Sequence, residues 1–176
     1  MSEVINNMKT RRSIRKYKTS PVDDKKMEQI LQAGLLAPSS RGKQPWEFIV
    51  VQDKDILQQL GKCRHPQQVF LPQTPAAIVV LGNTAMTDVW VEDCSIALTL
   101  MQMEAQKLGL GSCWVQIRKR QAQGEQQSSN AFVKALLNVP EQYDVLAILA
   151  LGEPDEKKTP YQLDKLAYEK IHKEQF

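Results

Sequence analysis

Apolar residues along the chain follow two different spacings, and each spacing predicts a different element. From Met27 to Leu35 they recur every three or four positions, which predicts a helix that Asp23 caps. That helix should end near Ala37, because Pro38 disfavours helical geometry in the residue before it. Shorter apolar runs, rich in β-branched residues, predict buried strands. The further predicted helices are 55–60, 88–108 and 129–137, and the predicted strands are 47–51, 77–81, 113–117 and 143–151.

Helices and strands are interleaved, which predicts an α+β or α/β fold with helices packed on a sheet. Ser129 is the expected cap of the last predicted helix. Residues 118–129 are polar and rich in glutamine, so we expect a mobile loop there that could cover a site. No repeat or linker divides the sequence, and we therefore expect a single domain over residues 1–176.

The longest predicted helix, residues 88–108, is apolar on nearly every side and is closed by Gly109. A helix that is apolar all round must be buried all round. A chain of 176 residues can hardly enclose six helical turns alone, which predicts an interface between two copies of the chain. A central core helix in a monomer is the alternative.

Composition is that of an ordinary globular protein, with 42% hydrophobic and 24% charged residues. The N-terminus lacks the apolar core of a signal peptide, and no apolar run could span a bilayer, so we expect a cytoplasmic protein without membrane contact. Cys63, Cys94 and Cys113 lack CxxC spacing and are expected to be free thiols. His65 and His172 lack ligand spacing, so no metal is expected.

Charge is concentrated near the N-terminus. Residues 9–18 hold six positive charges and no negative one, while the whole chain carries +3, so the remainder carries −3. This uneven distribution favours a local anion site over a nucleic-acid-binding surface. A small nucleic-acid-binding protein with a basic N-terminal arm is the alternative, although no helix-turn-helix, zinc or RNA-binding signature is present.

Three segments are candidates for chemistry. In the first, residues 11–15, the side chains of Arg12, Ser13 and Arg15 could converge on one phosphate, because guanidinium groups bind phosphate in a bidentate manner. A solvated basic arm is the alternative. In the second, residues 37–48, a loop dense in small and polar residues could offer donors to a flat polar ligand; the alternative is a plain turn with Trp46 in the core.

The third segment, residues 108–114, contains Gly109 and Gly111 between a helix and a strand. Glycine permits close approach of the backbone to a ring or a phosphate. The segment follows a helix, so it is not a dinucleotide-binding GxGxxG fingerprint. The alternative is a glycine-capped helix followed by a core strand.

Together, these segments resemble the nitroreductase family of flavoproteins in their order and spacing. The resemblance runs from Lys9 to His172. The matching stretches are RRSIRKY, APSSRGKQPWEFIVV, VEDCSIALTLMQMEAQKLGLGSCWV, LLNVPEQYDVLAILALGEP and YEKIH.

This resemblance implies an α+β fold with a central mixed or antiparallel sheet flanked by helices, in an intertwined homodimer with FMN at each of two subunit interfaces. It implies an enzyme that takes reducing equivalents from NADH or NADPH and passes them to small acceptors such as nitroaromatics, quinones or flavins by a ping-pong mechanism. Some relatives perform specialised flavin chemistry, and no residue in this sequence selects it. The flavin would perform the hydride transfer, consistent with the absence of a readable catalytic triad.

The resemblance also implies which residues hold the cofactor. Those expected around the phosphate, ribityl chain and pyrimidine edge are Arg11, Arg12, Ser13 and Arg15. Those expected to reach the isoalloxazine from the other subunit are Pro38, Ser39, Ser40 and Gln44. Gly111 and Ser112 would bond the reactive edge through their backbone, and Arg15 could offset the charge of the reduced ring.

Two positions depart from the family pattern. Lys165 stands where relatives often carry a phosphate-binding arginine, which keeps the charge but loses the bidentate fork. Gly42 stands where relatives often carry asparagine, so one contact with flavin or substrate is altered.

Overall fold

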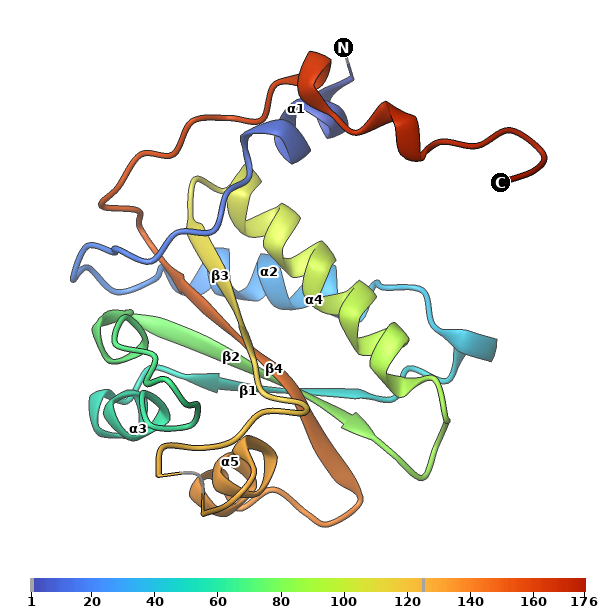
Figure 1. Cartoon of the computed structure of the whole chain (residues 1–176). Helices are drawn as coiled ribbons and strands as arrows, with labels where there is room; N and C mark the ends of the chain where they lie inside the picture. The colour runs from blue at the N-terminus through green and yellow to red at the C-terminus, as the bar shows by residue number, and fades with distance from the viewer. Residues whose placement is uncertain (1, 125) are drawn as a thin grey trace.

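A computed structural model describes residues 2–124 and 126–176 of the chain. Its centre is a four-stranded antiparallel sheet in the order β1-β2-β4-β3 (Figure 1). All four predicted strands are confirmed, and each is longer than predicted or shifted by one or two residues. The strands are β1 (Trp46–Val51), β2 (Ala76–Asn83), β3 (Gly111–Gln116) and β4 (Tyr143–Gly152).

Helices cover both faces of this sheet, which confirms the α+β fold. The helices α2 (Asp24–Leu35) and α4 (Trp90–Lys107) lie on one face, and α3 (Lys54–Leu60) and α5 (Ser129–Leu137) lie on the other (Figure 1). The central strands β2 and β4 are apolar runs because both of their faces are covered.

Successive side chains of β2 point to opposite faces and so belong to two separate cores. Val80 packs in the core beneath α2 and α4, and Val79 packs in the core beneath α3 and α5. Both are fully buried, so a one-residue shift of register would exchange the two cores.

The helix α4 is only partly enclosed by one chain, as the prediction of an interface expects. Leu98 and Met101 are fully buried against the sheet and α2, as expected. However, Ile96 and Leu100 keep 41% and 36% of their surface exposed. One chain therefore does not bury this helix all round, and an apolar stripe of α4 faces outward.

Two details at helix ends were not predicted correctly. Ser128, not Ser129, caps α5: its hydroxyl accepts the amide N–H of Ala131 at 3.1 Å, while Ser129 is the first helical residue. A further helix, α1 (Glu3–Thr10), precedes the basic segment. Its apolar residues, Val4, Ile5 and Met8, recur at helical spacing but are all exposed in one chain, and this short signal was passed over.

After β4 the chain returns along the basic segment, residues 9–18. We call the returning stretch, residues 153–161, the C-terminal strap. Backbone hydrogen bonds join the two segments: Lys18 N donates to Glu153 O at 2.9 Å, and Tyr161 N donates to Lys9 O at 3.0 Å. Beyond the strap, two short 3-10 turns, η3 (Leu163–Lys165) and η4 (Tyr168–Lys170), lead away from the sheet (Figure 1).

The loop predicted over residues 118–129 is held closely where the structure describes it. The amide of Gln123 donates to the Lys62 carbonyl at 3.0 Å, and the amide of His65 donates to the Gln121 carbonyl at 2.8 Å. Ala122 is 1% exposed. A lid made from these residues would have to break those bonds, so the geometry does not favour the predicted mobile cover.

No helix in the described part of the chain is long and apolar enough to cross a membrane.

Candidate functional site

The basic segment lies along the free edge of β3. Ile14 N donates to the Ser112 carbonyl at 3.0 Å, and Ser13 and Ser112 form a parallel bridge. This close approach requires Gly111, because a Cβ there would lie 2.8 Å from the Cβ of Ile14. The structure thus brings the first and third candidate segments together, with Ser112 buried between them.

The three arginines of this segment remain available for an anion. Arg12 donates to the Thr159 carbonyl, and its guanidinium lies 4.5 Å from the centre of the Tyr161 ring. Arg15 lies 6.0 Å from the centre of the Phe70 ring. Among the residues that the structure describes, no carboxylate lies within ion-pair distance of these guanidinium groups or of Arg11. Their charge is therefore not neutralised by a partner within the described chain.

Two residues that the sequence did not single out hold the turn that carries Arg15. The buried Tyr17 hydroxyl donates to the Ile14 carbonyl, and burial raises its pKa. The Glu156 carboxylate accepts the N–H groups of Arg15 at 2.6 Å and Lys16 at 3.2 Å. These contacts join residues 141 and 140 positions apart, so no local pattern could have revealed them.

Glu156 also pairs with Lys158 at 2.7 Å. The hydrogen bond from Lys158, followed by the one from the Arg15 amide, lowers the pKa of the Glu156 carboxyl. This carboxylate is therefore ionised at neutral pH and fixes the strap to the basic segment.

A small hollow opens beside this segment. Arg12, Ile14, Gly111, Glu156 and Lys158 are among its lining residues, and its volume is about 150 Å³. Pockets that enclose a small ligand usually measure roughly 300–1,000 Å³. One chain by itself thus forms only part of a cofactor-sized site.

The second candidate segment forms a tight loop at the other end of α4. It contains η1 (Ser40–Gly42), and its anchor is the amide of Ser40, which donates to Asp93 Oδ1 at 2.8 Å. The Ser39 hydroxyl accepts the amide of Gln44 at 2.9 Å. Trp46, which follows, is buried in the core beneath α4, as the plain-turn reading expected.

The two groups of predicted residues lie far apart within one chain (Figure 1). The basic segment meets the C-terminal half of α4, where Gln106 donates to the Thr10 hydroxyl at 3.3 Å. The loop meets its first turn through Asp93. Since a helix rises about 1.5 Å per residue, the contact points at Asp93 and Gln106 are about 20 Å apart. A single chain therefore does not bring Ser39, Ser40 and Gln44 to the basic segment, nor Pro38, which precedes them.

Lys165 lies in η3, four residues beyond the end of the strap at Tyr161. Its side chain makes no hydrogen bond or ion pair within the described part of the chain. Tyr161 contacts the Arg12 guanidinium, which places this stretch on the same side of the molecule as the basic segment.

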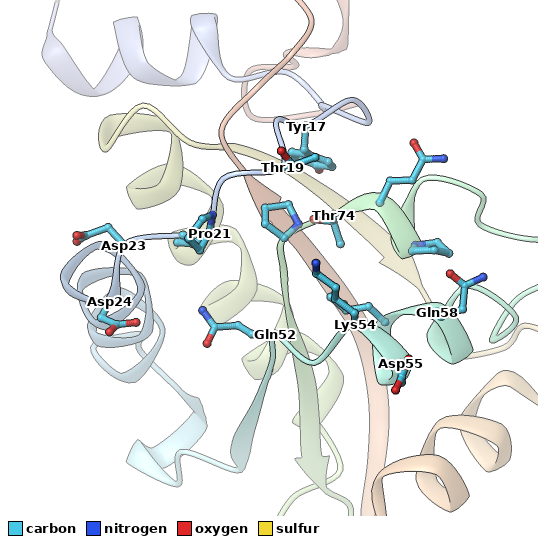
Figure 2. A pocket seen from close by; sticks show the side chains of 15 residues that line it. Tyr17, Thr19, Pro21, Asp23, Asp24, Gln52, Lys54, Asp55, Gln58 and Thr74 are labelled. Atoms are coloured by element: carbon cyan, nitrogen blue, oxygen red, sulfur yellow. The ribbon is translucent and has the colours of Figure 1, made fainter.

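A larger hollow, of about 1,180 Å³, lies elsewhere (Figure 2). It opens between residues 17–24, the start of α3 and residues 72–75, and none of the predicted site residues lines it. Two of its polar side chains already have partners: Asp23 accepts the first N–H groups of α2, and the Thr74 hydroxyl bonds to the Leu151 carbonyl at 2.7 Å.

The three cysteines are free, as predicted, and all are buried. Burial raises the pKa of the Cys63 and Cys94 thiols to about 12. Burial also raises the pKa of Cys113, although the charge of Arg15 opposes that rise. A thiol is a nucleophile only as thiolate, so none of the three is activated for covalent catalysis.

Comparisons with known proteins identify the family to which the chain is similar. The family model described as "Nitroreductase family" matches residues 8–68 and 62–153. A relative from Archaeoglobus fulgidus, provisionally named NADH dehydrogenase/NAD(P)H nitroreductase, is 35% identical over 181 aligned residues that cover 100% of both chains.

Solved structures that resemble this chain include members of the same family. An FMN-dependent nitroreductase from Clostridium difficile R20291 superposes with a TM-score of 0.95 at 44% identity, over 98% of this chain and 99% of that one. The NADPH:FMN oxidoreductase from Vibrio harveyi, solved in complex with NAD+, superposes with a TM-score of 0.82 at 25% identity, over 99% of this chain and 78% of that one.

Proposed function

Since the chain belongs to the nitroreductase family of oxidoreductases, we propose that it binds FMN between two copies of itself and transfers reducing equivalents from NADH or NADPH to small acceptors. One observation carries this proposal. The residues that resemble the two halves of a flavin site lie at opposite ends of α4, about 20 Å apart along the helix, so that one copy cannot close the site.

A two-fold symmetric dimer resolves this separation. In such a dimer the same surface patch of both copies meets, and the basic segment of one copy can face the loop of the other. The exposed apolar side chains of α4, Ile96 and Leu100, lie in sequence between the two contact points and need to be covered. Both observations support a dimer with two equivalent sites.

The donor set fits a phosphate-bearing flavin. Arg11, Arg12 and Ser13 would hold the phosphate and ribityl chain, since no carboxylate of the described chain neutralises the arginines. Arg15, whose backbone is held by Glu156, would lie beside the pyrimidine edge, where a fixed positive charge favours the reduced ring. Lys165 would add a point charge near the phosphate.

The partner copy would complete the site around the ring. Pro38, Ser39, Ser40 and Gln44 would contact the isoalloxazine from that copy. Gly111 and Ser112 would lie at its reactive edge through backbone groups. The Ser112 carbonyl already accepts from Ile14, so that contact would use an N–H group.

FMN, when bound, supplies the hydride chemistry, so the protein has to bind, orient and exclude water but needs no nucleophile. Consistent with this division, the cysteine thiols are buried and have raised pKa values. One open cleft above the ring would admit the nicotinamide and then the acceptor, which gives double-displacement kinetics.

Titration of the purified protein with FMN, followed by its visible absorption, tests the proposal. We expect saturable binding of one FMN per chain and reduction of the bound flavin by NADH or NADPH. Steady-state assays with both nicotinamides against nitroaromatics, quinones, free flavin and oxygen then identify the acceptor, and parallel reciprocal plots are expected. A protein that stays colourless in excess FMN overturns the proposal.

A further inference from the structure

The carboxylate of Asp93 is buried in an otherwise apolar part of the molecule. Asp93 belongs to the first turn of α4 and is 3% exposed. Its Oδ1 accepts the Ser40 amide at 2.8 Å, whereas its Oδ2 is buried and has no hydrogen-bond partner among the described residues. A buried polar oxygen without a partner destabilises a fold. Folding alone would be served as well by a neutral side chain here.

The loop that this carboxylate holds has an unusual backbone. Arg41, Gly42 and Gln44 all have positive φ values, of 53°, 65° and 49°. Residues with a side chain rarely adopt this region, and such conformations persist only where the surroundings enforce them. Two of these three residues are not glycine, so the loop needs external support.

Besides two backbone hydrogen bonds within the loop, from Gly42 N to Ser39 O and from Lys43 N to Ser40 O, three hydrogen bonds of side chains support it among the described residues. The Ser39 hydroxyl accepts the Gln44 amide at 2.9 Å, and Lys43 Nζ donates to the Met86 carbonyl at 2.6 Å. Both involve exposed groups of the loop. Only the third, between Asp93 and the Ser40 amide, ties the loop to a buried side chain of a long helix.

We propose that Asp93 is a positioning residue for the flavin: it fixes Ser40, and through Ser40 the left-handed loop 39–44, in the shape that meets the flavin bound by the basic segment of the second copy. This inference rests on the proposed function. It assigns to α4 the task of setting the loop as well as forming the dimer, so the loop is in place before the flavin arrives. Asp93 acts through backbone geometry and does not touch the reacting atoms.

Three variants test the assignment. Asp93→Ala removes the acceptor for the Ser40 amide, and Asp93→Asn keeps an acceptor of the same length without the charge. Cys94→Ala is the matched control, because it shortens the adjacent buried side chain of the same helix, whose thiol contacts the Leu81 carbonyl and not the loop.

Each variant is measured for FMN dissociation constant, for the visible circular dichroism of the bound flavin, and for dimer mass and unfolding without FMN. We expect Asp93→Ala to remain a folded dimer, to bind FMN at least tenfold more weakly and to change the dichroism of the ring. Asp93→Asn should restore the affinity to within about threefold of the unsubstituted protein. Cys94→Ala should leave the affinity and the spectrum unchanged.

The outcomes separate the two proposals. If the unsubstituted protein takes up no FMN, the proposed function fails, and the inference fails with it. If it binds FMN and Asp93→Ala behaves like Cys94→Ala, only the positioning role is overturned. Equal losses in Asp93→Ala and Asp93→Asn also overturn it, because the acceptor would not be the operative feature. If Asp93→Ala does not fold, the test depends on Asp93→Asn. An FMN affinity of Asp93→Asn that differs more than tenfold from that of the unsubstituted protein contradicts the proposal.

Discussion

The backbone at Gly42 suits a position where the resemblance implies asparagine. Its φ of 65° lies in the left-handed region, and a Cβ built there would meet nothing within 4 Å. Asparagine is the residue that most often shares this region with glycine. The asparagine that the resemblance implies at this position would meet the same backbone requirement.

This account predicts a difference between two substitutions. Gly42→Ala should lower the free energy of unfolding by about 1 kcal/mol. The added Cβ would meet no neighbour, but alanine is strained in the left-handed region. Gly42→Asn should cost less, since asparagine tolerates that conformation. Denaturant unfolding of both variants measures the difference. Equal stability of the alanine variant and the unsubstituted protein would contradict a left-handed requirement.

The second prediction concerns FMN binding by the guanidinium groups of Arg12 and Arg15. A hydrogen bond to a charged group contributes roughly 1.5–3 kcal/mol. Replacing both arginines by alanine should therefore weaken FMN binding at least tenfold. Riboflavin, which lacks the phosphate, should lose only the contribution of Arg15 at the pyrimidine edge, so its binding should change less.

Fluorescence titration with the two flavins provides the measurement, and Lys16→Ala is the control, since it removes a positive charge from the same segment. If FMN and riboflavin bind the unsubstituted protein equally well, these residues do not recognise phosphate.

The C-terminal strap has a pH dependence that follows from Glu156. The folded protein lowers the pKa of this carboxyl below its ordinary value of 4.5, first through Lys158 and then through the Arg15 amide. A lowered pKa means that the stabilisation is present above the unfolded pKa and is lost as pH falls through the folded pKa. The contact therefore weakens below about pH 4.5.

We expect Glu156→Gln to be less stable than the unsubstituted protein at pH 7 and to approach it at pH 3. Unfolding curves at the two pH values test this. Glu153→Gln should show a smaller change, because the pair of Glu153 with Lys18 is exposed and water screens it. A stability gap for Glu156→Gln that is the same at both pH values would exclude ionisation of Glu156 as the cause.

The helix α4 leads to a prediction about assembly. Leu100 is 36% exposed in one chain and lies in the apolar stripe that the proposed dimer covers. Leu100→Asp should place a charge in that interface and convert a dimer of about twice 20.0 kDa into a monomer that has lost its FMN.

Light scattering with absorbance detection measures mass and flavin together. Gln58→Asp, on α3 at the opposite face of the sheet, should keep both. A Leu100→Asp monomer with full FMN occupancy would show that one chain is sufficient for the site.

For the molecule as a whole, the proposed sharing of sites between two copies would link folding, assembly and cofactor binding. Species that bind only the folded dimer raise its apparent stability by mass action. The melting temperature should therefore increase with protein concentration and increase further with added FMN. Thermal scans over a hundredfold range of concentration test this, and a melting temperature that does not depend on concentration would argue against an obligatory dimer.

The parts that could be read from the sequence are those with a local cause. The strands β2 and β4 were predictable because two covered faces make each an apolar run. Arg12 and Gly111 could be identified as candidates from the sequence. They lie beside the same hollow because the basic segment runs along the edge of β3, and the spacing of residues in the sequence does not reveal that contact.

Other parts had no local cause, or their signal was passed over. The helix α1 buries nothing in one chain, and the helical spacing of Val4, Ile5 and Met8 was passed over. The signal for Asp93 was present, as a carboxylate within a helix that is otherwise apolar on most sides, and only the structure shows that it reaches Ser40.

The pairing of the basic segment with the C-terminal strap affects the order in which the molecule is built. Arg12 and its acceptor on Thr159 are 147 positions apart. At synthesis rates of about 5–20 residues per second, the strap follows the arginines by roughly 7–30 seconds. The central strand β4 ends at Gly152, only seven residues before Thr159, so the sheet and the strap are completed almost together. In the proposed flavin site, a chain that stops before Thr159 would lack the acceptor that holds Arg12, so flavin uptake would require synthesis through the strap.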